Sequence, residues 1–168
     1  SMSEDYSNNE IGLKKVLRTD MENIKATIDE INTDTFEKVI DSILRARRVY
    51  ILGLRSSTAL ADYFGFYLGI LVDDVKVVRT GISDVFEQIL RVTKDDLVIG
   101  ISYPRYSRRT LDVLKYVKAQ QCKVVGITNS LISPIASIAD YTLIARSNML
   151  SFVDSLVAPM SLINALII

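Results

Sequence analysis

Apolar residues near the start of the chain recur every three or four positions, the period of one face of an α-helix. They are Leu13, Leu17, Met21, Ile24, Ile28 and Ile31. The pattern predicts an amphipathic helix within residues 13–33. Residues 1–12 are polar, and Ser1-Met2 resembles the pair left when an affinity tag is cleaved. We therefore expect residues 1–12 to be a disordered tag or linker.

A second helix is predicted directly after the first. Asp34 is followed three residues later by Glu37, which is the spacing of a capping box at a helix start. The apolar positions from Phe36 to Leu44 again have helical spacing. The sequence thus predicts that this helix opens at Asp34.

From residue 49 onward, short β-branched runs alternate with stretches of helical spacing. The expected strands are 49–52, 75–78, 97–101, 123–127 and 141–145. The expected helices are about 58–71, 84–91, 108–120, 134–138 and from Phe152 onward.

This alternation predicts an α/β fold, a flavodoxin-like three-layer sandwich in which a five-stranded parallel sheet has helices on both faces. The runs VIGIS and VVGIT carry no polar alternation, as expected for central strands that are covered on both sides. Ligands of such folds bind outside the carboxyl ends of the strands, so the strand-to-helix loops are the place to look for function.

The composition excludes several kinds of catalytic site, metal site and partner. The 168 residues include no histidine and one cysteine, which excludes histidine-based triads, zinc helices, disulfides and thiolate metal sites. We therefore expect no metal and no cofactor. Twenty Lys and Arg balance twenty Asp and Glu, so nothing attracts nucleic acid or an anionic membrane generally. The longest apolar stretch, 156–168, is too short for a bilayer and no signal pattern precedes the domain, so we expect a cytoplasmic protein.

The first strand-to-helix loop ends in Ser56 and Ser57, at a helix start whose free N–H groups favour an anion. One of these serines could equally serve as the helix N-cap, so both interpretations stay open. The loop has no P-loop pattern, and Arg55 occupies the position of the second glycine in a dinucleotide fingerprint.

The second loop, residues 102–110, is richer in chemistry, with two serine hydroxyls and three arginines. Cations near a helix N-terminus oppose the helix dipole, and a bound phosphate reverses that balance. Arg108 and Arg109 fit a solvated basic face equally well. Arg105 lies within the loop itself, where we expect it to contact a ligand or a neighbouring subunit.

The third loop contains Ser133 among other small polar residues, which ordinary turn chemistry also explains. The fourth leads into the last predicted helix, with Asp154 expected on its first turn. Three of the four loops thus end in serine-rich helix starts.

Three of these segments resemble motifs of sugar isomerase (SIS) domains, in the same order. Ile101-Ser102 through Ser107 to Thr110-Leu111 resembles I-S-x-S-G-x-T-x-x-T-L, and Gly53 to Ser57 resembles G-x-G-x-S. Ser133-Pro134-Ile135-Ala136 with Ala139-Asp140 resembles S-P-L-A…A-D. The resemblance implies a phosphosugar-binding SIS domain over residues 34–168.

Within that superfamily the chain resembles the RpiR-type bacterial transcriptional regulators most, in which an N-terminal helix-turn-helix domain and a linker helix precede the SIS domain. Residues 13–33 correspond to the linker helix, and the DNA-binding domain is expected to be absent from this chain. The resemblance implies a phosphosugar-sensing effector domain that regulates carbohydrate metabolism, bound to DNA only through that absent domain. The implied ligand-binding residues are Ser56, Ser57, Ser102, Arg105, Ser107, Thr110 and Ser133.

The chain also departs from the family pattern. Pro104 and Arg105 replace the second serine and the glycine of S-x-S-G, and Arg55 replaces the second glycine of the first loop. A hydroxyl and a close backbone approach are lost there, while cations are gained.

Catalysis is not expected. Isomerases of the superfamily use a glutamate base after the last strand, whereas no glutamate follows Glu87 in this chain. Asp154 is the acid in that segment, and we expect it to stabilise the N-terminus of the last helix. No catalytic residue is therefore assigned. The alternatives are a phosphosugar aldose–ketose isomerase and an assembly module with a decayed pocket.

The last predicted helix is apolar around most of its circumference, which requires burial against the sheet and a partner subunit. The stripe at 13–31 also requires a partner. We therefore expect a homodimer. The chain ends on Ile167-Ile168 within a helix, and we expect further protein to follow.

Overall fold

The computed structural model describes residues 2–149, 151 and 153–168. Five parallel strands form one sheet in the order β2-β1-β3-β4-β5. The strands are β1 (Val49–Gly53), β2 (Val75–Val78), β3 (Leu97–Ser102), β4 (Lys123–Thr128) and β5 (Tyr141–Ile144). This order confirms the predicted flavodoxin-like fold.

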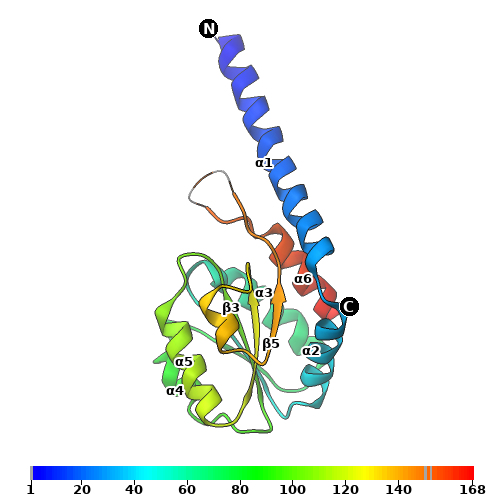
Figure 1. The fold of residues 1–168 in the computed structure, drawn as a ribbon. Helices are drawn as coiled ribbons and strands as arrows, with labels where there is room; N and C mark the ends of the chain where they lie inside the picture. The colour runs from blue at the N-terminus through cyan, green and yellow to red at the C-terminus, as the bar shows by residue number, and fades with distance from the viewer. Residues whose placement is uncertain (1, 150, 152) are drawn as a thin grey trace.

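Helices cover both faces of the sheet (Figure 1). On one face, α2 (Thr33–Arg45), α3 (Thr58–Leu71) and α6 (Val157–Ile167) enclose one hydrophobic cluster. On the other, α4 (Val85–Ile89), α5 (Arg108–Ala119) and the 3-10 turn η2 (Pro134–Ser137) enclose a second cluster. A further 3-10 turn, η1 (Arg55–Ser57), links β1 to α3.

The central strands are apolar because each side chain meets one of the two helical layers. In β1, Val49 and Ile51 belong to the first cluster, while Tyr50 and Leu52 belong to the second. Every residue of β1 and β3 is buried, which is why neither strand shows polar alternation. Each of the five strands lies within one residue of its predicted limits.

The first helix, α1 (Met2–Glu30), extends away from the body of the molecule (Figure 1). It begins earlier than predicted, since residues 2–12 are helical rather than disordered. The polar stretch contains no proline, and Glu10 pairs with Lys14 one turn later at 3.0 Å, which supports a helix. The division into a linker helix at 13–33 and a domain at 34–168 stays a prediction.

The predicted capping box at Asp34 is wrong. The N-cap of α2 is Asn32, whose side chain accepts a hydrogen bond from the Thr35 N–H at 3.0 Å. Asparagine is as good an N-cap as aspartate, and here it comes first after α1 ends. Asp34 therefore lies within the first turn, where its charge still suits the helix dipole.

The last helix also starts later than predicted. Phe152, its predicted first residue, lies outside the described residues, and α6 begins at Val157. Pro159 explains this start, because proline lacks an N–H and is tolerated only in the first turn of a helix. A helix that began near residue 152 would place Pro159 in its interior.

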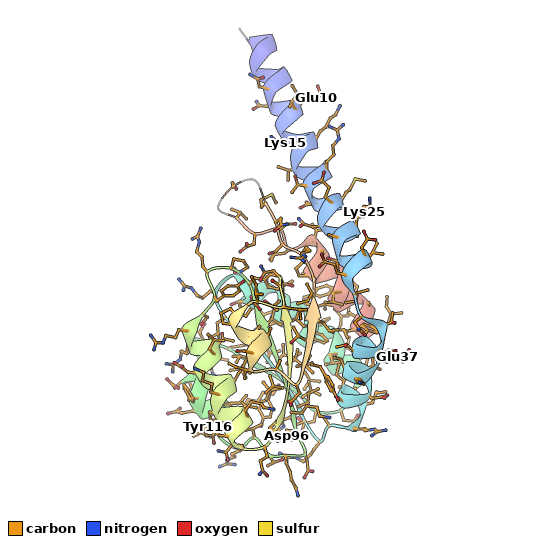
Figure 2. All side chains as sticks on the ribbon, viewed as in Figure 1. Glu10, Lys15, Lys25, Glu37, Asp96 and Tyr116 are labelled. Carbon is orange, nitrogen blue, oxygen red and sulfur yellow. The ribbon has the colours of Figure 1, made fainter. Side chains whose placement is uncertain are left out.

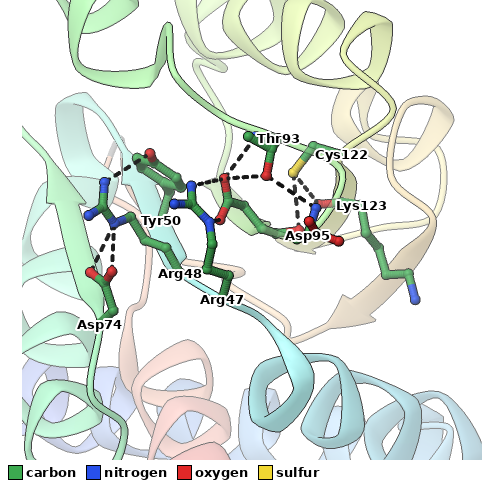
Figure 3. A network of polar contacts seen from close by, with 9 residues as sticks. Arg47, Arg48, Tyr50, Asp74, Thr93, Asp95, Cys122 and Lys123 are labelled. Atoms are coloured by element: carbon green, nitrogen blue, oxygen red, sulfur yellow. Dashed lines mark hydrogen bonds and ion pairs between the residues drawn. The ribbon is translucent and has the colours of Figure 1, made fainter.

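Ion pairs connect residues at the amino ends of the strands (Figure 3). The buried Asp96 carboxylate accepts hydrogen bonds from Arg47 at 2.9 and 3.0 Å and from the Thr93 N–H at 2.8 Å. Burial raises the pKa of Asp96, but these donors outweigh it, and the net pKa is lowered. Asp96 lies at the end of the molecule away from α1 (Figure 2).

Among the described residues, no helix is both long enough and apolar enough to cross a membrane.

Candidate functional site

A pocket of about 310 Å³ lies among the loops that leave the carboxyl ends of the strands. The first, second and fourth loops line it, with Arg55, Ser56, Pro104, Arg105, Val153, Asp154 and Leu156. The chain runs from β1 outward to β2 on one side, and β3 lies on the other side of β1. This is the switch in strand order where ligands of such folds bind.

Two buried hydroxyls at this edge have no hydrogen-bond partner within the described part of the chain. They are the Oγ atoms of Ser102, which is 3% exposed, and Ser133, which is 4% exposed. Ser102 ends β3 and pairs in register with Thr128, the last residue of β4. An unsatisfied buried hydroxyl costs about 1–3 kcal/mol, so two of them at one edge of the sheet make this edge a candidate ligand site.

The first loop does not use its buried serine as a helix cap. Ser57 occupies the N-cap position of α3, yet its side chain makes no capping hydrogen bond. A Cβ on Gly53 would lie 2.7 Å from the Ser57 carbonyl oxygen, so only glycine allows the loop to fold back on the strand end. Ser56 is exposed and lines the pocket.

In the second loop, Ser107, which is predicted from the sequence to be a ligand-binding residue, is the N-cap of a helix. Its Oγ accepts a hydrogen bond from the Thr110 N–H at 3.3 Å and begins α5, while Thr110 itself is buried. Two tyrosines hold the loop in place. The buried Tyr103 donates its hydroxyl to the carbonyl of Ala145 at 3.1 Å, and Tyr106 donates to Asn129 Oδ1 of the third loop at 2.7 Å.

Arg55 and Arg105 have φ angles of 56° and 57°, in the left-handed region that favours glycine. Both replace glycines of the SIS pattern, so the backbone keeps the conformation that the glycines permit. An L-residue in this region costs about 1–2 kcal/mol. Both of these strained residues line the same pocket.

Arg109 is directed away from the pocket. It forms an ion pair with Asp84, and its guanidinium stacks over the ring of Phe86 at 5.4 Å. This arginine therefore ties α5 to α4. Arg108 is exposed on the same helix and does not line the pocket.

The predicted role of Asp154 is wrong. It lies before α6, whose N-cap position is Leu156, so it is not on the first turn of the helix. It lines the pocket instead, with Arg105 close enough to act on its charge. Burial raises the pKa of Asp154, and Arg105 partly opposes that rise. The signal that places Asp154 outside the helix is Pro159.

The structure thus separates the predicted residues into three groups. Ser56 and Arg105 line the pocket. Ser57, Ser102, Thr110 and Ser133 are buried, and Ser107 caps a helix. The third loop, with Ser133, contributes no residue to the pocket lining. No group of three or more acidic or cysteine side chains among the described residues is arranged to hold a metal ion.

The fold and these loops define a flavodoxin-like α/β protein with hydroxyl and guanidinium groups at its switch point. Residues 42–168 match the model of the SIS domain, and the chain belongs to that family.

Similar proteins include both regulators and enzymes. The chain is 27% identical over 149 residues to an uncharacterized HTH-type transcriptional regulator of Haemophilus influenzae, covering 82% of this chain and 48% of that protein. It is 32% identical over 130 residues to the isomerizing glutamine–fructose-6-phosphate aminotransferase of Sulfurisphaera tokodaii, covering 74% and 21%. The chain therefore spans about half or less of these two relatives.

Among solved structures, the sugar isomerase domain of an RpiR transcription factor from Sphaerobacter thermophilus has a TM-score of 0.87. The two are 29% identical, and the match covers 91% of this chain and 86% of that one.

Proposed function

We propose that this chain is the phosphosugar-sensing effector domain of a helix-turn-helix transcriptional regulator of carbohydrate metabolism. The observation that carries the proposal is the buried, unpartnered Ser102 hydroxyl at the end of β3. It lies two residues before Pro104, which lines the pocket. Similarity to a regulator and to an RpiR domain supports the regulatory role.

The phosphate group is assigned to the starts of α3 and α5, where the helix dipoles favour an anion. Ser57 supplies a hydroxyl at the start of α3, Ser102 supplies one at the end of β3, and Arg105 supplies a guanidinium at the pocket wall. A phosphate satisfies N–H, hydroxyl and guanidinium donors together, which no neutral sugar does.

The sugar is assigned to the pocket itself. A volume of about 310 Å³ lies at the lower end of the range for small-molecule sites. Val153 and Leu156 form apolar wall, while Arg55 and Asp154 offer polar groups for hydroxyls. One relative is named for an enzyme that acts on fructose 6-phosphate, which supports this class of ligand.

The alternative function, aldose–ketose isomerisation, has one observation in its favour, because Asp154 is a carboxyl group in the pocket with a raised pKa. Proton transfer between sugar carbons needs a base within hydrogen-bond reach. Among the described residues, the pocket lining holds no glutamate, lysine or second acid beside Asp154. Sensing therefore remains the better fit.

The remaining partners follow from the same proposal. The regulator is a cytoplasmic homodimer that contacts DNA through a separate N-terminal domain. Exposed apolar residues along α1, including Leu13, Leu17 and Met21, supply a surface for the second subunit.

A thermal-shift panel of hexose, pentose and amino-sugar phosphates tests the proposal. A ligand at one hundred times its Kd adds about 2.7 kcal/mol to the free energy of unfolding. We expect at least one phosphosugar to raise the Tm while its unphosphorylated sugar does not. A panel without any stabilising phosphosugar at millimolar concentration contradicts sensing of this class. Turnover between aldose and ketose phosphates, lost in Asp154→Asn, favours the isomerase instead.

A further inference from the structure

One face of the carboxyl-terminal half of α1 is joined by polar contacts to residues 146–148 and 155 of the segment between β5 and α6 (Figure 1). The α1 residues are spaced three, four and three positions apart, so they share one helical face. We call them the α1 ladder: Asp20, Asn23, Thr27 and Glu30.

Asn23 forms the centre of the ladder. It is 3% exposed, its Nδ2 donates to the Asn148 carbonyl at 2.6 Å, and its Oδ1 accepts from the Asn148 N–H at 3.0 Å. A side-chain amide thus pairs with one backbone residue in both directions. This geometry fixes the position of the segment relative to α1 more tightly than a single hydrogen bond does.

The segment is held on either side of Asn148 as well. Thr27 Oγ1 accepts from the Arg146 N–H at 3.0 Å, and Glu30 accepts two hydrogen bonds from the Arg146 guanidinium, each at 2.8 Å. At the other end, the buried Ser155 donates its hydroxyl to Asp20 Oδ1 at 2.6 Å.

Ser155 connects the ladder to the pocket. Its neighbours Asp154 and Leu156 both line the pocket, while its own side chain binds α1. Its N–H also donates to the Ser147 carbonyl at 3.1 Å, which joins the two ends of the segment. The residues that shape one wall of the pocket are therefore held by the helix that leaves the domain.

We infer that the α1 ladder couples the pocket to α1: it holds Asp154 and Leu156 in the position that binds the phosphosugar, and a bound phosphosugar in turn strengthens the attachment of α1. The inference rests on the proposed function. Coupling between two sites is reciprocal, so a ligand that binds better when the ladder is formed stabilises the ladder by the same factor. The amino-terminal half of α1 projects from the body, so a change in its attachment is passed outward (Figure 2).

The test combines binding and hydrogen exchange in the wild type, Asn23→Ala and Glu30→Ala. Glu22→Ala is the matched control, because Glu22 is exposed on α1 outside the ladder. If Asn23→Ala does not fold, because Asn23 is buried, Glu30→Ala still tests the inference. The probes are fructose 6-phosphate, glucosamine 6-phosphate and inorganic phosphate.

We expect both ladder variants to bind the phosphosugar more weakly, Asn23→Ala by about tenfold or more, with Glu22→Ala unchanged. In the wild type, the phosphosugar slows amide exchange in residues 18–30, and in the ladder variants this slowing shrinks. Wild-type affinity in a folded ladder variant, with no effect of ligand on exchange in α1, overturns the coupling and leaves sensing intact. A wild type that binds none of these probes and no phosphosugar of the thermal-shift panel overturns the proposed function, and the coupling with it.

Discussion

Arg55 and Arg105 adopt the same left-handed backbone conformation, with φ of 56° and 57°, in two loops that line one pocket. Glycine adopts this conformation without strain, whereas arginine does not. The two arginines therefore adopt a backbone conformation that arginine disfavours, at positions where the SIS pattern has glycine. Strain of this kind collects where a side chain serves binding.

This relationship predicts opposite effects on stability and binding. We expect Arg105→Gly to leave the free energy of unfolding unchanged or to raise it by up to about 1 kcal/mol. Phosphosugar affinity should fall, because a charge-assisted contact is lost. Urea unfolding and calorimetric titration measure the two quantities. A variant that binds as the wild type does would show that Arg105 does not touch the ligand.

Ser102→Ala, at the carboxyl end of β3, should also affect stability and ligand binding differently. Removing a buried hydroxyl that has no partner leaves the stability unchanged or raises it by about 1 kcal/mol. The same change removes a proposed phosphate ligand and should weaken phosphosugar binding by about tenfold or more. The exposed Ser83→Ala is the control, with neither effect expected. Marked destabilisation of Ser102→Ala argues that the hydroxyl is structural.

Gly53→Ala tests whether the first loop needs its close approach to the strand end. A Cβ there would meet the Ser57 carbonyl oxygen at 2.7 Å, so we expect lower stability and weaker ligand binding. A methyl group at Gly69, within α3, would meet no atom of a neighbouring element within 4 Å, so Gly69→Ala is the matched substitution. Since alanine favours helices more than glycine does, Gly69→Ala should raise the free energy of unfolding by about 0.5–1 kcal/mol. Equal melting temperatures for the two variants would rule out the steric argument.

The two perturbed carboxyl groups predict opposite dependences on pH. The folded pKa of Asp96 is lowered, so its contribution to stability is present above about pH 4 and disappears as the pH falls through the folded pKa. Asp96→Asn should therefore be less stable than the wild type at pH 7, and the gap should narrow at acidic pH. Thermal unfolding between about pH 2.5 and 7 measures this gap, and a constant gap would contradict the ion-pair explanation.

Asp154 is the opposite case, since its folded pKa is raised, mainly by burial. A raised carboxyl pKa favours folding at low pH, and that contribution is lost as the pH rises through the folded pKa. We therefore expect Asp154→Asn to melt at a higher temperature than the wild type near pH 7, with a smaller difference at acidic pH. A lower melting temperature for Asp154→Asn near pH 7 would assign the carboxylate a structural contact instead.

The strands could be predicted to within one residue because a strand that is buried on both faces appears in the sequence as a continuous apolar run, such as VIGIS. Helix starts were harder to predict. Asn32 and Asp34 are both good caps, and the structure uses Asn32. The start of α6 depends on Pro159, whose position argues against a helix from residue 152.

The site was predicted in part. Serine and arginine at helix starts indicated loops of which the first and second line the pocket, because those residue types and the strand order both point to one edge of the sheet. The pairing of Asn23 with Asn148 spans 125 residues and leaves no periodic signal, so only the folded chain shows it. The position of Asp154 in the pocket follows from the same long-range arrangement.

The central claim is that a phosphosugar binds at the carboxyl edge of the sheet. A titration followed by amide NMR locates the ligand directly. With fructose 6-phosphate or glucosamine 6-phosphate, we expect shifts at residues 54–58, 102–110 and 153–156, and none around Asp96 at the opposite edge. Shifts that gather around Asp96, or no shifts with either phosphosugar at millimolar concentration, would contradict the claim.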